Sequence, residues 1–202
     1  MEGLRKTLVI NGCSQGKLSH PAPAREFYTG QLFRMVRKFA ELHNFDQRIV
    51  SGKYGLLTLD CLVEPYDMKI TNKADVNRVQ EKCLYSLVTL HRTYDTIIVV
   101  LGKKYKEVLS PILDSKCLVV FNKKGLFAYY SLFARFNKIS TEQVLEELAN
   151  FRVFECEHCE IEDDLPRTCY FCSYRDSNKC SLDIKFQTVI PIGQKTTSEG
   201  EL

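Results

Sequence analysis

Short apolar segments alternate with amphipathic ones along most of this 202-residue chain, and that alternation constrains the fold more than any other feature. The segments 25–43 and 74–92 carry apolar side chains at helical spacing, and 141–150 begins with a helix-capping pattern. Strands are predicted by the apolar runs at residues 4–11, 48–51, 96–101 and 117–121. Such alternation is typical of a mostly parallel sheet covered by helices on both faces. The sequence therefore predicts a three-layer α/β/α domain over residues 1–150, with about four strands and a ligand site at their carboxyl ends.

Two Cys-x-x-Cys pairs follow this domain. Of the nine cysteines, five fall within residues 156–180, which favours a metal site over a set of disulfides. The predicted ligands are Cys156, Cys159, Cys169 and Cys172, with His158 or Cys180 as an alternative ligand. Four thiolates complete a tetrahedral zinc shell, so this zinc would be structural and not catalytic. We therefore expect a zinc-ribbon-like four-cysteine module over residues 151–188 and a flexible polar tail over 189–202.

The overall composition leaves several partners open. No apolar run approaches the roughly 20 residues that a membrane-spanning helix needs, and no signal-peptide pattern is present. We therefore expect a soluble, cytoplasmic protein without a membrane partner. The net charge of +3 allows a nucleic-acid partner through local basic patches but does not require one.

Polar loops follow the first two predicted strands, and adjacent parallel strands would bring both loops to one edge of the sheet. Gly12 and Gly16 in the first loop would allow its backbone to approach a ligand closely. This loop matches neither the Walker pattern nor the dinucleotide fingerprint, so neither ATP nor NAD is expected. The candidate binding residues are Ser14, Lys17, His20, Arg25 and Tyr28 from the first segment, and Ser51, Lys53, Tyr54, Glu64, Tyr66 and Asp67 from the second.

Several of these residues stand in strings that resemble a known family. The strings are Cys13-Ser14, Lys17, Pro-Ala-Pro-Ala-Arg at 21–25, Tyr28, Ser-Gly-Lys-Tyr-Gly-Leu-Leu at 51–57 and Glu-Pro-Tyr-Asp at 64–67. Over residues 5–70 the chain resembles the YaaA-like family of bacterial and phage proteins. The resemblance implies DNA binding, nucleobase chemistry and an α/β/α core similar to uracil-DNA glycosylases, although their Gln-Asp-Pro-Tyr string is absent. It also makes a role in phage defence a hypothesis.

The leading hypothesis is a hydrolase that acts on N-glycosidic bonds, namely a DNA N-glycosylase that flips out and excises a modified base. Such a reaction develops positive charge on the sugar and needs a carboxylate, for which Asp67 is the first candidate and Glu64 the second. Tyr66 or Tyr54 would stack on the base. The remaining binding candidates would hold the phosphate or the base edge, and Lys53 could alternatively act as a Schiff-base nucleophile.

Other interpretations remain open. The first is a non-catalytic DNA-binding protein that grips the backbone through the zinc module and a basic face of Arg34, Arg37, Lys38, Lys103, Lys104 and Lys106. The second is a tRNA base-modification enzyme with RNA as partner. Cys13 could also be a nucleophile with His20 as its base. In a purely structural interpretation, Glu64 and Asp67 are solvated loop carboxylates and the tyrosines fill the sheet edge.

Overall fold

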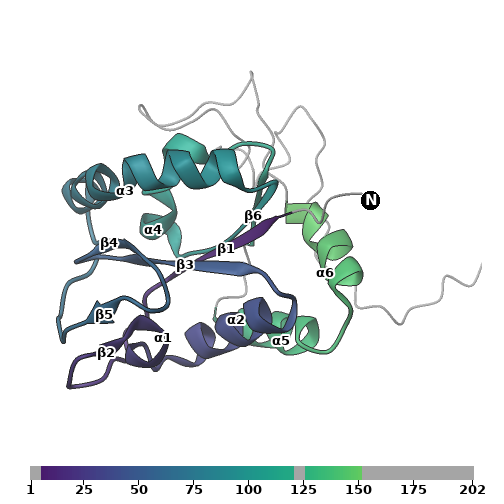
Figure 1. Cartoon of the computed structure of the whole chain (residues 1–202), viewed down its shortest axis with the longest axis horizontal. Coiled ribbons are helices and arrows are strands. Elements are labelled where there is room, and N and C mark those ends of the chain that lie inside the picture. Colours follow the sequence, from purple (N-terminus) through teal and green to yellow (C-terminus); the bar gives the residue numbers. More distant parts are fainter. Residues whose placement is uncertain (1–5, 121–125, 152–202) are drawn as a thin grey trace, which may run out of the picture.

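A five-stranded, mostly parallel sheet forms the centre of the chain in the computed structural model, which describes residues 6–120 and 126–151 (Figure 1). The strand order is β4-β3-β1-β6-β7. Strands β3, β1, β6 and β7 are parallel, and β4 runs antiparallel to β3. The strands are β1 (Thr7–Gly12), β3 (Asp46–Ser51), β4 (Gly55–Leu57), β6 (Thr96–Val100) and β7 (Cys117–Val119). The α/β class is confirmed, with β4 as a strand that the sequence pattern did not predict.

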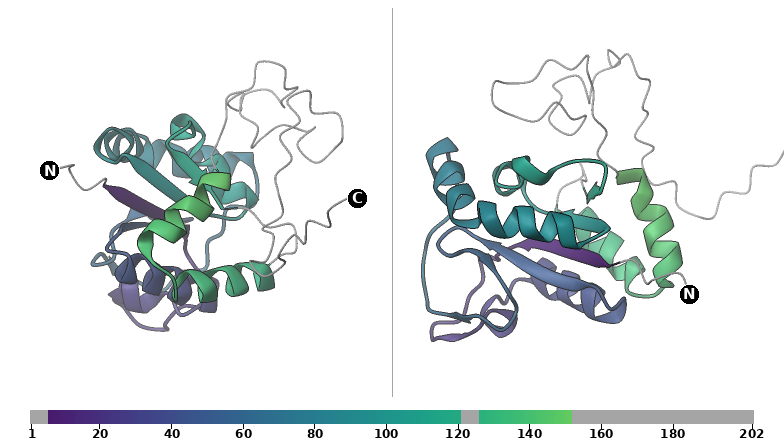
Figure 2. Two further views of the ribbon diagram at one scale, coloured as in Figure 1. Left: turned by 90° about the vertical axis from the view of Figure 1, so that its right-hand side faces the viewer. Right: turned by 45° about the horizontal axis from the view of Figure 1, so that its top comes forward.

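Helices cover both faces of this sheet. Helices α2 (Gln31–Leu42), α5 (Leu126–Phe136) and α6 (Thr141–Leu148) lie on one face, and α3 (Lys73–Thr93) and α4 (Lys103–Glu107) lie on the other. The additional views show the sheet between these two layers (Figure 2). Single 3-10 turns at Ser110–Ile112 and Ala149–Phe151 complete the helical segments. The helices at 74–92 and 141–150 were thus predicted to within a few residues.

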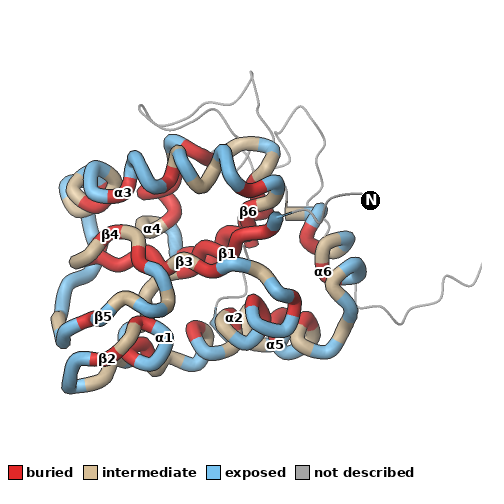
Figure 3. The backbone as a smooth tube through the Cα atoms, viewed as in Figure 1, coloured by how far each residue is buried: buried red, intermediate tan, exposed pale blue. Residues whose placement is uncertain are grey.

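Alternate side chains of each central strand enter separate cores on the two faces of the sheet. From β1, Leu8 and Ile10 pack under α3, whereas Val9 packs against Phe39 of α2 and Phe133 of α5. The burial map shows the strands as the most continuously buried segments and the helices as buried on their inner sides alone (Figure 3). Parallel strands covered on both faces require continuous apolar sequences, which is why the apolar runs predicted these strands.

The helix predicted over residues 25–43 is interrupted, so this prediction was wrong in its continuity. A short helix α1 (Ala24–Phe27) precedes α2, and the backbone between them is extended at Tyr28 (φ −89°, ψ 108°) and Gly30 (φ −62°, ψ 144°). Tyr28 is fully buried by this break, at 1% exposure. Tertiary packing of this aromatic ring outweighs the local helical periodicity.

The segment after β3, which the sequence predicted as a loop, contains two further strands. Gly55 takes a left-handed conformation (φ 79°) at the turn into β4, a conformation that glycine adopts without strain. Strand β5 (Leu62–Val63) then pairs antiparallel with β2 (Ala22–Pro23) in a separate two-stranded sheet. The two loop segments predicted to share a site therefore do meet through this small sheet.

The zinc prediction concerns a part of the chain beyond the described residues. Cys156, Cys159, Cys169 and Cys172, with the alternatives His158 and Cys180, lie outside them, as do the tail at 189–202 and all of the 151–188 module except residue 151. Within the described ranges, no helix combines the length and apolar character needed to span a membrane.

Candidate functional site

The order of the strands creates a topological switch point between β1 and β6. The chain leaves β1 through α1 and α2 toward β3 on one side, and leaves β6 through α4 toward β7 on the other. In open α/β sheets, ligands bind in the crevice at such a point, outside the carboxyl ends of the strands. A pocket with a volume of about 500 Å³ lies there, within the roughly 300–1,000 Å³ range of small-molecule sites.

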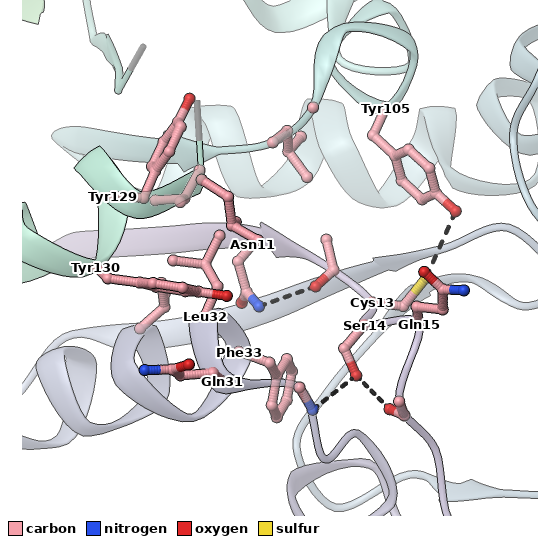
Figure 4. Close-up of a pocket in the computed structure, with 18 residues that line it drawn as sticks. Asn11, Cys13, Ser14, Gln15, Gln31, Leu32, Phe33, Tyr105, Tyr129 and Tyr130 are labelled. Atoms are coloured by element: carbon pink, nitrogen blue, oxygen red, sulfur yellow. Dashed lines mark hydrogen bonds between the residues drawn. The ribbon is translucent and has the colours of Figure 1, made fainter. Parts of the chain in front are cut away.

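The described residues that line this pocket are uncharged. The residues that line it belong to the end of β1 and the loop after it, the end of β6 and the start of α4, the first turn of α2, and α5 (Figure 4). In the close-up, Tyr130 of α5 lies to one side of Asn11, and Tyr105 and Cys13 lie to the other. Among the described lining residues there is no Asp, Glu, Lys, Arg or His. Aromatic rings with a few amide and hydroxyl groups suit an uncharged, planar ligand.

A buried amide lies at the end of β1 within this pocket. Asn11 is 2% exposed, its Nδ2 donates to the Gly12 carbonyl (3.2 Å), and its Oδ1 accepts from Nε2 of Gln47 on β3 (2.7 Å). A buried amide without hydrogen-bond partners would destabilise the fold by about 1–3 kcal/mol. The hydrogen bond from Gln47 therefore offsets part of the cost of burying Asn11.

The loop after β1 is held against the first turn of α2. Ser14 Oγ accepts from the backbone N–H of Gly30 (3.1 Å) and donates to the Gly16 carbonyl. A Cβ atom at position 30 would lie 2.5 Å from the Ser14 Cβ, so only glycine permits this close approach. Ser14 is thereby both a lining residue and the anchor that shapes the pocket wall.

Two tyrosines fix the remaining walls. Tyr105 OH accepts a hydrogen bond from Cys13 Sγ (3.6 Å), and burial raises the pKa of Tyr105 well above its usual value, so its hydroxyl is neutral at physiological pH. Tyr129 OH donates to the Val120 carbonyl (3.2 Å), which ties α5 to the chain just after β7.

A hydroxyl cluster lies on the other side of the 13–17 loop. Tyr66 OH is hydrogen-bonded to both Ser51 Oγ and Tyr28 OH, each at 2.8 Å, and the Ser51 oxygen also accepts from the backbone N–H groups of Lys53 (3.3 Å) and Tyr54 (3.2 Å). Burial raises the pKa of Tyr28 to about 12 and shifts that of Tyr66 upward as well. Cys13 packs against this cluster and so separates it from the pocket.

Two ammonium groups flank the ring of Tyr66. Lys17 Nζ lies 4.7 Å from its centroid and Lys53 Nζ lies 5.7 Å from it, and Lys53 is also 4.8 Å from the centroid of Tyr54. These are cation–π distances. Neither lysine forms an ion pair with a carboxylate of the described residues, so both cations lack a counter-ion there.

The structure brings together some of the residues predicted from the sequence and separates others. Ser51, Lys53, Tyr54, Tyr66, Lys17 and Tyr28 gather in the hydroxyl cluster and around it. Arg25 is engaged in an exposed ion pair with Asp60. His20, Glu64 and Asp67 are exposed and have no hydrogen bond or ion pair with any described residue. Among the binding and catalytic residues predicted from the sequence, Ser14 is the one that lines the pocket.

The basic residues proposed as one DNA-binding face are divided between the two faces of the sheet. Arg34, Arg37 and Lys38 belong to α2, whereas Lys103 and Lys104 belong to α4. Lys106 is buried, at 2% exposure. A single continuous basic face across these residues is therefore not formed.

The sequence pattern did not predict the pocket residues Asn11, Tyr105 and Tyr130, nor Gln47, which hydrogen-bonds to Asn11. A polar amide at the end of an otherwise apolar strand was a usable signal for Asn11. The others depend on strand order and helix placement, which the pattern does not encode. No group of three or more His, Cys, Asp or Glu side chains arranged to hold a metal occurs within residues 6–120 and 126–151.

Residues 8–125, more than half of the chain, match the model of DUF6884, a family of unknown function, and the chain belongs to that family. No curated protein matches it. Family membership does not connect the chain with YaaA-like proteins or uracil-DNA glycosylases, so that resemblance stays a prediction.

Proposed function

We propose that the protein recognises a nucleobase of DNA in the pocket between β1 and β6, and that it hydrolyses the N-glycosidic bond of that base. The observation that carries the proposal is the pocket itself, which combines aromatic rings with neutral amide and hydroxyl groups at the switch point of the sheet. Nucleobases are planar, uncharged and rich in hydrogen-bonding groups, so this lining is matched to them. Base-processing enzymes hold an extruded base in such pockets by stacking and by hydrogen bonds to its edge.

The two lysines beside Tyr66 support recognition of the base as part of a DNA strand. Lys17 and Lys53 have no carboxylate partner among the described residues, and they lie just across Cys13 from the pocket. A phosphate of the strand would neutralise both ammonium groups while the base occupies the pocket. Phosphate contacts position a nucleic acid without reading its sequence, and the pocket would supply the selectivity.

For the hydrolytic step, Asp67 is the first candidate to activate water and Glu64 the second. Both are exposed and belong to the same segment as Tyr66. A specific observation favours the alternative of base recognition without catalysis: the described lining residues include no carboxylate. Binding and bond cleavage are therefore tested separately.

Two further parts of the proposal concern the rest of the chain. We infer a structural zinc ion bound by Cys156, Cys159, Cys169 and Cys172, where it would brace a DNA-facing module without taking part in the reaction. We also infer a reducing, cytoplasmic location. The free thiols of Cys13, Cys61, Cys83 and Cys117 support this location, because such thiols persist where disulfides are rare.

The test of the proposal uses a pocket-filling variant. A Cβ at Gly102 would meet no heavy atom within 4 Å, and the backbone there has a negative φ of −70°, so Gly102→Leu adds a side chain at the pocket wall without a clash at its Cβ or backbone strain. Ser86→Leu, at an exposed and uncharged position of α3 outside the lining, is the control. Oligonucleotides that carry a panel of modified bases are incubated with each protein, and alkali-labile abasic sites and DNA affinity are measured.

We expect abasic sites with the wild type and the control, and none with Gly102→Leu. Abasic sites that persist in Gly102→Leu would refute the assignment to this pocket. DNA binding by the wild type without abasic sites on any substrate would refute hydrolysis and leave recognition alone. Loss of cleavage with retained binding in Asp67→Asn would support Asp67 as the catalytic carboxylate, and preferential binding of RNA in competition would favour the tRNA alternative.

A further inference from the structure

An exposed aromatic ring lies beside the pocket, at the start of α5. Phe127 is 81% exposed and is not part of any buried cluster of the described residues. Its ring meets the ring of Tyr130 edge to face, with the centroids 6.0 Å apart and the planes at 86°. Tyr130 lines the pocket beside Asn11 (Figure 4). The aromatic wall of the pocket therefore continues through Phe127 onto the surface.

Leu126 extends this surface, and we call Leu126 and Phe127 together the α5 rim. Leu126 is 53% exposed and also lines the pocket. Single exposed apolar side chains are common on proteins, whereas adjacent ones that border a pocket mark a binding surface. Helix α5 carries no Asp or Glu, and its one charged residue, Arg135, is paired with Glu147. No carboxylate of α5 would thus repel a negatively charged strand at this rim.

The α5 rim and the two lysines beside Tyr66 lie on different sides of the pocket. Lys17 and Lys53 lie across Cys13 from the pocket, and in the close-up Cys13 and Tyr130 lie on opposite sides of Asn11. A strand that places a phosphate near the lysines and one base in the pocket would therefore continue toward the α5 rim. The group that it meets there is an aromatic ring with an exposed face.

We propose that Phe127 stacks on the base next to the one in the pocket, and that the substrate is therefore single-stranded DNA. This inference rests on the proposed function and names the form of its substrate. A base that leaves its stack to enter the pocket deprives its neighbour of a stacking partner, and the exposed face of Phe127 would replace that partner. In a duplex the neighbouring base stays paired and stacked, so its face is not free for the ring.

The α5 rim would add affinity without sequence selectivity, because every base has an aromatic face. Stacking of a base on an aromatic side chain corresponds to about 5- to 100-fold in affinity. We expect Phe127→Ala to weaken the binding of a single strand by this factor. The affinity for a free nucleoside, which has no neighbouring base, should stay unchanged.

The experiment is a thermodynamic cycle between Phe127 and the neighbouring base. The probes are single-stranded pentanucleotides with a modified base from a panel at the centre and thymine on both sides, the same strands with an abasic spacer in place of one neighbour, and the free central nucleosides. Affinities are measured for the full-length wild type, Phe127→Ala and Phe127→Tyr, with Gly102→Leu as the blocked-pocket reference. Tyr85→Ala is the matched control, because Tyr85 is 86% exposed on α3, which covers the opposite face of the sheet.

Removal of one of the two neighbouring bases should weaken binding about 5- to 100-fold in the wild type, Phe127→Tyr and Tyr85→Ala, but not in Phe127→Ala. A duplex with the same central base should bind more weakly than the single strand. If no probe binds, or if Gly102→Leu binds as well as the wild type, the proposed function fails. If Gly102→Leu blocks binding but Phe127→Ala depends on the neighbouring base as the wild type does, this inference alone fails. Equal affinity for duplex and single strand would overturn it as well.

Two further measurements on Phe127→Ala distinguish stacking from other roles of the ring. A lower affinity for the free nucleoside would mean that Phe127 acts through Tyr130 on the pocket. A changed oligomeric state in sedimentation would assign the ring to a contact between copies of the chain, and a urea midpoint below that of Tyr85→Ala would assign it to packing within the chain. Each of these results would overturn the inference, which expects none of these changes.

Discussion

The hydroxyl of Ser51 connects a strand end, a turn and two tyrosines, so its removal should destabilise the fold more than the loss of one hydrogen bond. The side chain is fully buried, and its oxygen is bonded to Tyr66 OH at 2.8 Å and accepts the backbone N–H groups of Lys53 and Tyr54 at 3.3 and 3.2 Å. Ser51→Ala removes all three contacts and leaves two N–H donors without this acceptor.

The magnitude follows from the lengths of these bonds. The Tyr66 bond contributes about 1 kcal/mol, and each of the two N–H bonds, which are longer than the usual 2.9–3.0 Å, contributes about half of that. The expected loss is about 2 kcal/mol of unfolding free energy. Tyr28→Phe removes one bond of 2.8 Å to Tyr66 and should therefore lower the unfolding free energy by about 1 kcal/mol.

Urea unfolding followed by circular dichroism measures both values. With a slope of about 2 kcal/mol/M, the midpoint should fall by about 1 M for Ser51→Ala and about 0.5 M for Tyr28→Phe, at unchanged slope. Ser131→Ala is the control, because the exposed Ser131 hydroxyl bonds within its own helix to the Phe127 carbonyl, and its midpoint should move little. A midpoint for Ser51→Ala no lower than that for Tyr28→Phe would refute the view that Ser51 organises the cluster.

Three further outcomes are expected. The unfolding free energy should fall as the pH rises from 10.0 toward about 12. Burial raises the pKa of Tyr28 to about 12 from 10.0, so the unfolded chain loses the Tyr28 proton at a lower pH than the folded chain. Urea midpoints measured across that pH range should fall less steeply in Tyr28→Phe than in the wild type. Gly30→Ala should displace the 13–17 loop, since its Cβ would lie 2.5 Å from that of Ser14, and should lower nucleoside affinity at least tenfold by calorimetry; unchanged affinity would contradict the described wall. Atomic absorption should find a single zinc ion per chain, absent in a Cys156→Ser, Cys159→Ser double variant, and its removal by a chelator should weaken DNA binding before it affects the α/β domain.

The layered fold was predictable because its determinants are local. Strands β6 and β7 are short apolar runs buried on both faces, and helix α3 has one apolar stripe, so the spacing of apolar residues along the chain indicates their type. The break at Tyr28 was not predictable, because the buried position of this ring depends on residues distant in the sequence, such as Tyr66, which is 38 positions away. The strand at Gly55–Leu57 is short, and its pairing depends on the turn at Gly55.

The sequence predicted that the site lies at the carboxyl ends of the strands, but not whether it lies between β1 and β3 or between β1 and β6. The polar loops after β1 and β3 were predicted as the site because they carry charged and aromatic residues. These loops form the hydroxyl cluster around Tyr66. The pocket lies on the opposite side, where β6 adjoins β1. Strand order results from long-range pairing, and the neutral residues that line this pocket, such as Asn11 and Tyr130, have no charge pattern to mark them.

A crystal structure of the protein with a short single-stranded DNA that contains deoxyuridine tests the central claim most directly. We predict one base inside the pocket between β1 and β6 and a neighbouring phosphate near Lys17 and Lys53. Bound DNA with every base outside this pocket would contradict the account.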